Sequence, residues 1–299
     1  MTEVNVEVLL RLGKYDQALE AAGTKLRAAR SREEPATLAL ALLDEARAEL
    51  ALGDRDHAVQ SVDEAISRAR RGFGPKDTHY AQALELGAEV AAEADMPHVA
   101  ESRFRAALDI LEEAQVRGVP LLHAMFHYGK FRKSQGDVSG AARSFLGIIQ
   151  RVPTTADHDA ARYSAMAHTA LGRLAYEAGK PAEARALGDR ALETWLAIQE
   201  ARRTEVADGM ALVGAAALAE LDADAATAFL ETACEIYSMC GGKRRSEHAT
   251  AAYDYARALD AQHKTAEAHA AYLKALDMYR EGDPVRIEIE QRMMDMARS

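Results

Sequence analysis

The fold is decided by the stretch Gly53-Asp54-Arg55-Asp56-His57-Ala58, in which an alanine follows a turn glycine by five residues. The same alanine slot recurs along the whole chain, at Ala18, Ala58, Ala100, Ala141, Ala184, Ala226 and Ala268. The six gaps between these alanines are 40, 42, 41, 43, 42 and 42 residues. A nearly constant period of this length indicates a repeat architecture, in which each repeat buries its apolar face against its neighbours.

Other positions keep the same register. Five residues before the alanine stand the turn residues Gly13, Gly53, Asp95, Gly136, Gly179, Leu221 and His263. Twelve residues before it stand mostly small residues, namely Val6, Ala46, Ala88, Gly129, Gly172, Gly214 and Ala256. Apolar residues recur four, seven and eight positions after the alanine, as in Phe104, Ala107 and Leu108. These offsets share one face of a helix, so each repeat predicts a first helix, a tight turn and a second helix docked on the first.

The helix bounds follow from this register and from the glycine and proline residues between repeats. We expect first helices over residues 3–12, 35–52, 77–94, 118–135, 159–178, 204–220 and 246–261, and second helices over 15–30, 55–71, 97–116, 138–151, 181–201, 223–239 and 265–281. The tail predicts one more helix, with apolar Val285, Ile287, Ile289, Met293, Met294 and Met296. A terminal repeat exposes an apolar face unless something covers it, so we expect a C-terminal capping helix in residues 284–299.

The pattern of small residue, glycine, alanine, bulky residue and alanine-apolar pair resembles the tetratricopeptide repeat (TPR) over residues 3–280. The common TPR has a period of about 34 residues, and the longer spacing here resembles the variant found in kinesin light chains. This chain departs from the pattern where it lacks the turn glycine, at Asp95, Leu221 and His263, and where the kinesin-light-chain groove usually has asparagine, at Asp44, His127 and Asp254. The usual proline after the second helix is present only once, at Pro153. The resemblance implies an all-α, right-handed superhelical solenoid of about seven hairpins in residues 1–283.

Composition and charge narrow the class of partner. Of the 299 residues, 48% are hydrophobic and 28% are charged, which is typical of a folded soluble protein. The 37 basic and 47 acidic residues give a net charge of −10, so nucleic acid and anionic membranes are poor partners. We expect no membrane-spanning segment and no signal peptide, and therefore a cytoplasmic protein. The two cysteines, Cys234 and Cys240, form no CxxC pair that would indicate zinc or a disulfide framework.

Candidate chemistry is sparse. His123 and His127 stand four residues apart and could face one metal ion, but the sequence shows neither a His-Glu-x-x-His motif nor a third ligand. The segment Gly241-Gly242-Lys243-Arg244-Arg245-Ser246 has the wrong glycine spacing for a phosphate-binding loop. We expect Trp195 and Cys234 to be core residues. The sequence therefore predicts no enzyme, no catalytic residue, no cofactor and no metal site.

The resemblance to TPR proteins implies that the first helices line a concave partner-binding surface. On each first helix, the positions −3, +1 and +4 relative to the small crossing residue share one face. Four of the six +1 positions from the second repeat onward are basic, and the middle two repeats pair that charge with Phe126 and Tyr176. Basic and aromatic side chains together suit a docking surface, so we predict that the partner-binding residues are Arg47, Phe126, Lys130, Lys133, Arg173, Tyr176 and Arg257.

Two functions remain open on the sequence alone. The first is a scaffold or adaptor that holds a partner protein or an extended acidic segment. The second is a regulator that responds to a signalling peptide, as in bacterial regulators with similar repeats. Those regulators usually carry a DNA-binding helix-turn-helix before the repeats, whereas here the repeat begins by Val6, so we expect the scaffold. The sequence leaves the oligomeric state open.

Overall fold

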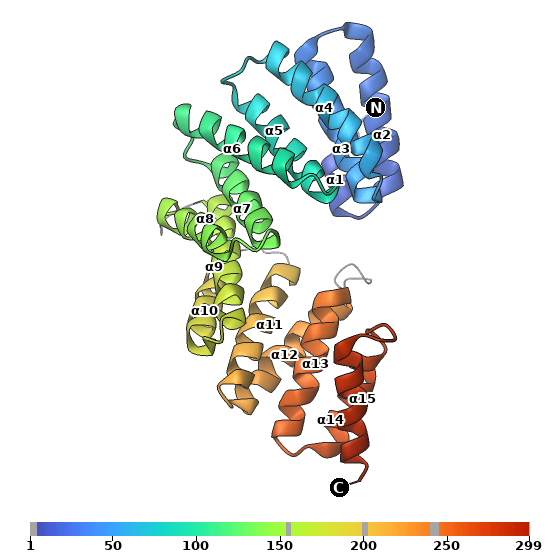
Figure 1. The fold of residues 1–299 in the computed structure, drawn as a ribbon, viewed down its shortest axis with the longest axis vertical. Helices are drawn as coiled ribbons and strands as arrows, with labels where there is room; N and C mark the ends of the chain where they lie inside the picture. Colours follow the sequence, from blue (N-terminus) through green and yellow to red (C-terminus); the bar gives the residue numbers. More distant parts are fainter. Residues whose placement is uncertain (1–4, 154–156, 199–202, 240–244, 299) are drawn as a thin grey trace. The chain divides into compact units, whose positions relative to one another are not determined.

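The computed structural model describes residues 5–153, 157–198, 203–239 and 245–298, and these residues are α-helical with no β-strand (Figure 1). The described helices follow one another as hairpins, with bounds α1 (Val6–Arg11), α2 (Tyr15–Arg32), α3 (Pro35–Leu52), α4 (Arg55–Gly72), α5 (Thr78–Glu93), α6 (Pro97–Glu113), α7 (Val119–Ser134), α8 (Val138–Arg151), α9 (His158–Glu177), α10 (Pro181–Ala197), α11 (Arg203–Ala219), α12 (Ala223–Ser238), α13 (Arg245–Ala261), α14 (Thr265–Leu276) and α15 (Pro284–Met296). The predicted fold class, an array of helical hairpins closed by a C-terminal helix, is confirmed.

The helices gather into two compact units, residues 1–144 and residues 145–299, which are called unit 1 and unit 2 below. Within unit 1 the first helices α1, α3, α5 and α7 contact one another in order, and within unit 2 the first helices α9, α11 and α13 do the same. Side chains from consecutive first helices therefore form one face in each unit. The predicted domain bounds, 1–283 and 284–299, stay a prediction.

The repeating alanine is the point of closest helix packing. All seven of these alanines are completely buried. The bulky residues four positions later are buried as well, for example Phe104, Phe145 and Leu230, each at most 1% exposed. The predicted role of the register is confirmed, because every repeat buries the same face of its second helix.

The small crossing residues face these alanines. A Cβ atom added to Gly172 on α9 would lie 3.2 Å from the carbonyl oxygen of Ala184 on α10. A Cβ atom on Gly214 would lie 3.3 Å from the carbonyl oxygen of Ala226. Such distances leave no room for a side chain, so glycine permits the two helices of these hairpins to approach backbone to backbone.

The turn between the two helices has the same backbone in all seven repeats. The residue five positions before the alanine has a positive φ each time, whether it is glycine or not: Gly13, Gly53, Asp95, Gly136, Gly179, Leu221 and His263. At Leu221 the N–H donates to the carbonyl of Leu218 at 3.1 Å, and the next N–H donates to the carbonyl of Ala217 at 2.9 Å. These two bonds form a Schellman motif, which satisfies the last carbonyls of the helix. The three repeats that lack the turn glycine therefore keep the same turn.

We expect Leu221→Gly to stabilise the protein by about 0.5–1 kcal/mol. Leu221 has a φ of 65° and is 90% exposed, so its side chain makes the left-handed backbone costly without packing against the protein. Glycine removes that cost of about 1–2 kcal/mol, and its greater freedom in the unfolded chain offsets part of the gain. Urea unfolding at 25 °C measures the difference.

The reciprocal change serves as the control. Gly53 occupies the equivalent turn with a φ of 81°, and a Cβ atom there would meet nothing within 4 Å. Gly53→Ala should therefore destabilise the protein by about 1 kcal/mol through backbone conformation alone. If Leu221→Gly were less stable than the wild type, the contacts of the leucine side chain would stabilise the fold by more than its left-handed backbone destabilises it.

Helix α14 is shorter than predicted, ending at Leu276 instead of residue 281. Arg286 on α15 donates from Nη1 to the carbonyls of Leu276 and Tyr279, both at 3.1 Å. Gly282 then takes a φ of 83°, and Asp283 precedes a proline, which disfavours helical backbone. A contact from the following helix thus satisfies the last carbonyl of α14 and a carbonyl just beyond it, which the local sequence does not reveal.

The capping helix α15 covers the last hairpin. Ile289 is completely buried, in a cluster with residues of α13 and α14. Met293 and Met296 pack on the same cluster, whereas Ile287 and Met294 are more than half exposed. Asp283 caps the helix by accepting from the N–H of Val285 at 2.9 Å. The capping role is confirmed, although only one side of the apolar tail is buried.

Among the described residues, no helix combines the length and the apolar character that a bilayer crossing requires.

Candidate partner-binding surface

The predicted binding residues all lie on first helices, but they divide between the two units. Arg47 lies on α3 of unit 1, and Phe126, Lys130 and Lys133 lie on α7 of the same unit. Unit 2 holds the remaining three, which are Arg173 and Tyr176 on α9 and Arg257 on α13. The continuity of the surface from α7 to α9 stays a prediction.

In unit 1 the aromatic residue of the predicted surface, Phe126, is less exposed to solvent than a binding residue was expected to be. Phe126 is only 9% exposed, and its ring packs edge-on against the ring of His127 with centroids 5.9 Å apart. Lys130, one helical turn later, is exposed, and Lys133 is half-buried. A partner would therefore meet Lys130 directly and only the rim of Phe126.

The three arginines of the surface lie beside carboxylates of the same protein. The guanidinium of Arg47 lies 3.7 Å from Asp44, a carboxylate that also accepts from Lys25 Nζ at 3.0 Å. In unit 2, Arg173 donates from Nη2 to Asp208 at 3.4 Å, between α9 and α11. The hydroxyl of Tyr237 donates to the same Asp208 oxygen at 2.7 Å. The sequence pattern showed the basic residues but did not show which carboxylates would pair with them.

The C-terminal end of the surface carries a buried carboxylate. Asp254 on α13 is 7% exposed and accepts from Arg257 Nη1 at 3.0 Å. Burial raises the pKa of Asp254, and the charge and hydrogen bond of Arg257 oppose that shift. The Arg257 guanidinium also lies 5.5 Å from the centre of the Tyr253 ring, within reach of a cation–π interaction. Burial likewise raises the pKa of Tyr176, and the charge and hydrogen bond of Arg257 oppose this shift too.

An open cleft of about 810 Å³ lies between α13, α14 and α15. Tyr253 and Arg257 line it on the side of the predicted surface, and Glu288 and Arg292 line it on the side of the capping helix. Arg292 donates to both oxygens of Asp260, at 2.6 Å and 2.8 Å. This bidentate pair joins α15 to α13 and lowers the pKa of Asp260, first through the hydrogen bond with Arg292.

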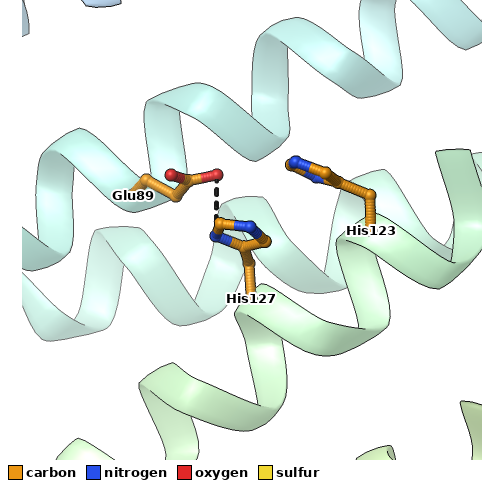
Figure 2. A group of neighbouring side chains, drawn as sticks. All are labelled: Glu89, His123 and His127. Carbon is orange, nitrogen blue, oxygen red and sulfur yellow. Dashed lines mark ion pairs between the residues drawn. The ribbon is translucent and has the colours of Figure 1, made fainter. Parts of the chain in front are cut away.

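In unit 1, a polar cluster lies on the face formed by the first helices, where α5 meets α7 (Figure 2). His127 Nδ1 lies 3.1 Å from Glu89 Oε1, and His123 Nδ1 is hydrogen-bonded to Glu85. The two imidazole rings are stacked with their centroids 4.3 Å apart. Two acidic residues spaced i, i+4 thus face two histidines with the same spacing on the next first helix.

The carboxylates shift the charge state of this cluster. Burial disfavours the charged form of His123, but the hydrogen bond with Glu85 and the charges of Glu85 and Glu89 outweigh it and raise the pKa of His123. Burial also opposes ionisation of Glu89, yet His127, with the charges of His123 and Lys130, lowers the pKa of Glu89. Glu85 and Glu89 were not among the predicted site residues. The matching i, i+4 spacing on two consecutive first helices is the sequence signal that could have found them.

Three other features of the sequence are Trp195, Cys234 and the glycine-rich basic segment. Trp195 is 1% exposed in a cluster with Ala165, Ala191 and Ile198, as predicted for a core residue. Cys234 is half-buried between the clusters of α12, α13 and α14. Residues 241–244 of the glycine-rich basic segment lie outside the described residues, and so does Cys240.

Comparison with known proteins identifies the fold. No family model matches the sequence, and no curated protein matches it significantly. Solved structures do match. Cut9, in the APC/C hetero-tetramer Cut9-Hcn1, has a TM-score of 0.70 at 13% identity, over 97% of this chain and 48% of that chain. This chain therefore spans about half the length of that protein.

Two further structures match over most of both chains. The apo quorum sensor NprR from B. thuringiensis has a TM-score of 0.65 at 12% identity, over 98% of this chain and 85% of that chain. The C-terminal part of a TPR repeat-containing protein from Cytophaga hutchinsonii has a TM-score of 0.51 at 15% identity, over 95% and 97%. Together with the hairpin register, buried alanines and Schellman turns, these similarities show that the chain has the helical-hairpin repeat fold of tetratricopeptide-repeat proteins.

Proposed function

We propose that this protein is a non-catalytic cytoplasmic scaffold whose first-helix faces bind an extended, carboxylate-bearing segment of a partner protein. The observation that carries the proposal is the repeated basic residue one position after the crossing residue, at Arg47, Lys130, Arg173 and Arg257. The three arginine side chains are 45%, 43% and 44% exposed, and Lys130 is exposed as well. The same slot therefore presents a cation to solvent on two first helices of each unit.

The intramolecular carboxylates leave these arginines able to bind a ligand. A guanidinium has five N–H donors in a planar fork. Arg173 uses one donor for its hydrogen bond to Asp208, and Arg47 lies beside Asp44 at an ion-pair distance. The neighbouring carboxylates hold each guanidinium in place, so less side-chain entropy is lost when a ligand carboxylate takes the remaining donors. The surface should select a partner by the spacing of its acidic groups more than by a general positive field.

A second candidate is a receptor for a short signalling peptide. NprR, which shares the fold, has also been solved in complex with its cognate peptide NprX. In this chain the cleft of about 810 Å³ beside the capping helix places Arg257 and Tyr253 in reach of a peptide end. A receptor would bind short free peptides and change its compactness on binding, whereas a scaffold would bind long segments of a folded partner.

The charge-reversal variant Lys130→Glu/Arg173→Glu tests the scaffold. Fluorescence anisotropy with a panel of labelled 12-residue and 30-residue peptides, with and without acidic residues, would identify a ligand. The double variant should weaken its binding at least about tenfold whichever unit holds the ligand, because one hydrogen bond to a charged group is worth about 1.5–3 kcal/mol. Binding to the wild type should also weaken as salt is added.

Matched controls separate the surface from net charge. Arg143→Glu/Arg190→Glu makes the same charge change at exposed positions on the second helices α8 and α10, and it should alter affinity less than about threefold. Arg173→Gln weakens the surface without placing a second negative charge beside Asp208. Full affinity in the folded first-helix variant, together with loss of binding in the second-helix control, would assign the interface to the second helices instead.

A further inference from the structure

Three side chains on the first-helix face of unit 1 converge from two helices. Glu89 comes from α5, and His123 and His127 come from successive turns of α7 (Figure 2). Their ligand atoms all lie within 4.8 Å of one another. The third ligand that the sequence did not reveal is thus supplied by the preceding first helix. We infer that Glu89, His123 and His127 form a binding site for one divalent transition-metal ion, of which Zn²⁺ is the best match.

The distances suit a tetrahedral ion after a small movement. Zinc binds imidazole nitrogen and carboxylate oxygen at about 2.0–2.2 Å, so two ligand atoms of one tetrahedral ion lie about 3.3–3.6 Å apart. His127 Nδ1 and Glu89 Oε1 are 3.1 Å apart, close to that separation. His123 has to approach the other two by at most about 1.5 Å, the difference between 4.8 Å and the tetrahedral edge. Rotation of its side chain provides such a movement without moving α7.

Glu85 orients the His123 ring. This carboxylate is 5% exposed and is hydrogen-bonded to His123 Nδ1. In the tautomer in which Nδ1 donates to this carboxylate, Nε2 carries the lone pair that a metal needs. A carboxylate behind a ligating histidine is the usual outer partner at zinc sites. The stacked ring of His127, 4.3 Å away, keeps the two imidazoles on the same side of α7.

The donor set and the charges select the ion. Two imidazoles and one carboxylate suit Zn²⁺, Co²⁺ or Ni²⁺ better than Mg²⁺ or Ca²⁺, which prefer an all-oxygen set. One divalent cation would balance the negative charges of Glu85 and Glu89, while the nearby charges of Arg47 and Lys130 act on the same histidine and carboxylate and reduce the attraction. Three protein ligands leave the fourth position open to solvent or to a group from a ligand.

Isothermal titration of the chelator-treated protein with ZnCl₂ tests the site without any partner, so its outcome is independent of the proposed scaffold function. We expect one Zn²⁺ per chain. Glu89→Gln, His123→Gln and His127→Gln should each weaken binding more than about a hundredfold, and Glu85→Gln about 10–100-fold. Co²⁺ should give the intense visible absorption of a tetrahedral complex, and Mg²⁺ and Ca²⁺ should not compete with it.

The exposed His98 on α6 provides the control, because His98→Gln removes a surface histidine away from the cluster and should leave zinc affinity unchanged. Circular dichroism checks that each variant is folded. Zinc binding that survives all three ligand substitutions, or an absence of zinc binding by the wild type, would overturn the inference. If the ligand variants unfold, the wild-type Co²⁺ spectrum still decides, since a weak octahedral spectrum contradicts a site with three protein ligands in a tetrahedral set.

Discussion

Ala184→Leu should destabilise the protein by about 1–3 kcal/mol, because the side chain would enter the closest crossing between α9 and α10. Ala184 is completely buried, and its carbonyl lies 3.2 Å from the position of a Cβ atom on Gly172. Leucine adds three carbon atoms to a site where the neighbouring backbone cannot retreat, and overpacking of this kind costs about 1–3 kcal/mol. The same change at Ala141, the equivalent residue of α8, should have a similar effect. Urea unfolding monitored by circular dichroism measures both.

The matched control is Ala186→Leu, two residues later on the same helix. Ala186 is exposed, so leucine there changes helix propensity slightly and touches no core. We expect a change within about 0.5 kcal/mol. Equal stability of Ala184→Leu and Ala186→Leu would show that the repeating alanine is not at a close crossing, and the packing explanation of the register would then be wrong.

Cys234 should react with iodoacetamide between about thirtyfold and a thousandfold more slowly in the native protein than in the unfolded chain. Burial, with smaller contributions from Asp254 and Glu231, raises the pKa of the Cys234 thiol from 9.0 to about 12. The reactive thiolate therefore becomes about a thousandfold rarer at pH 8, since three pKa units separate the two states. A more basic thiolate is a better nucleophile, which offsets part of this loss and sets the lower limit.

A Cys240→Ser background makes Cys234 the single thiol, so that mass spectrometry follows one reaction. The rate in concentrated urea provides the unfolded reference. Native and unfolded rates that agree within a few-fold would mean that the thiol is open to solvent and that burial between α12 and α14 does not protect it.

Much of the fold could be predicted from the sequence because it depends on local patterns. The predicted bounds of α3 and α8 agree with the structure to the residue, and those of α4 and α12 agree within one residue, since glycine, proline and capping residues mark helix ends directly. The burial of the repeating alanines followed from helical periodicity. The prediction for α14 is about a turn too long, because the arginine that binds its last carbonyl belongs to another helix.

The candidate surface could be predicted only in part. Sequence periodicity showed that Arg47, Lys130, Arg173 and Arg257 occupy the same slot of successive first helices. It did not show that Asp44, Asp208 and Asp254 would pair with three of them, or that Phe126 would be 9% exposed. Burial depends on which side chains of the adjacent helices fill the space beside a residue. That information is spread over segments about 40 residues apart.

By itself, the sequence determined the repeat, the hairpins and the face that each helix buries, since these depend on spacings of 3 to 12 residues within one hairpin. Tertiary structure alone decided the backbone of the turns without glycine, where packing of the two helices holds Asp95, Leu221 and His263 in the left-handed region. It also decided the cluster of Glu89, His123 and His127, because a carboxylate meets a histidine 38 residues away only after two first helices lie side by side. Local preference sets the helices and the turns that contain glycine, whereas the chemistry of this surface depends on contacts between residues that are far apart in the chain.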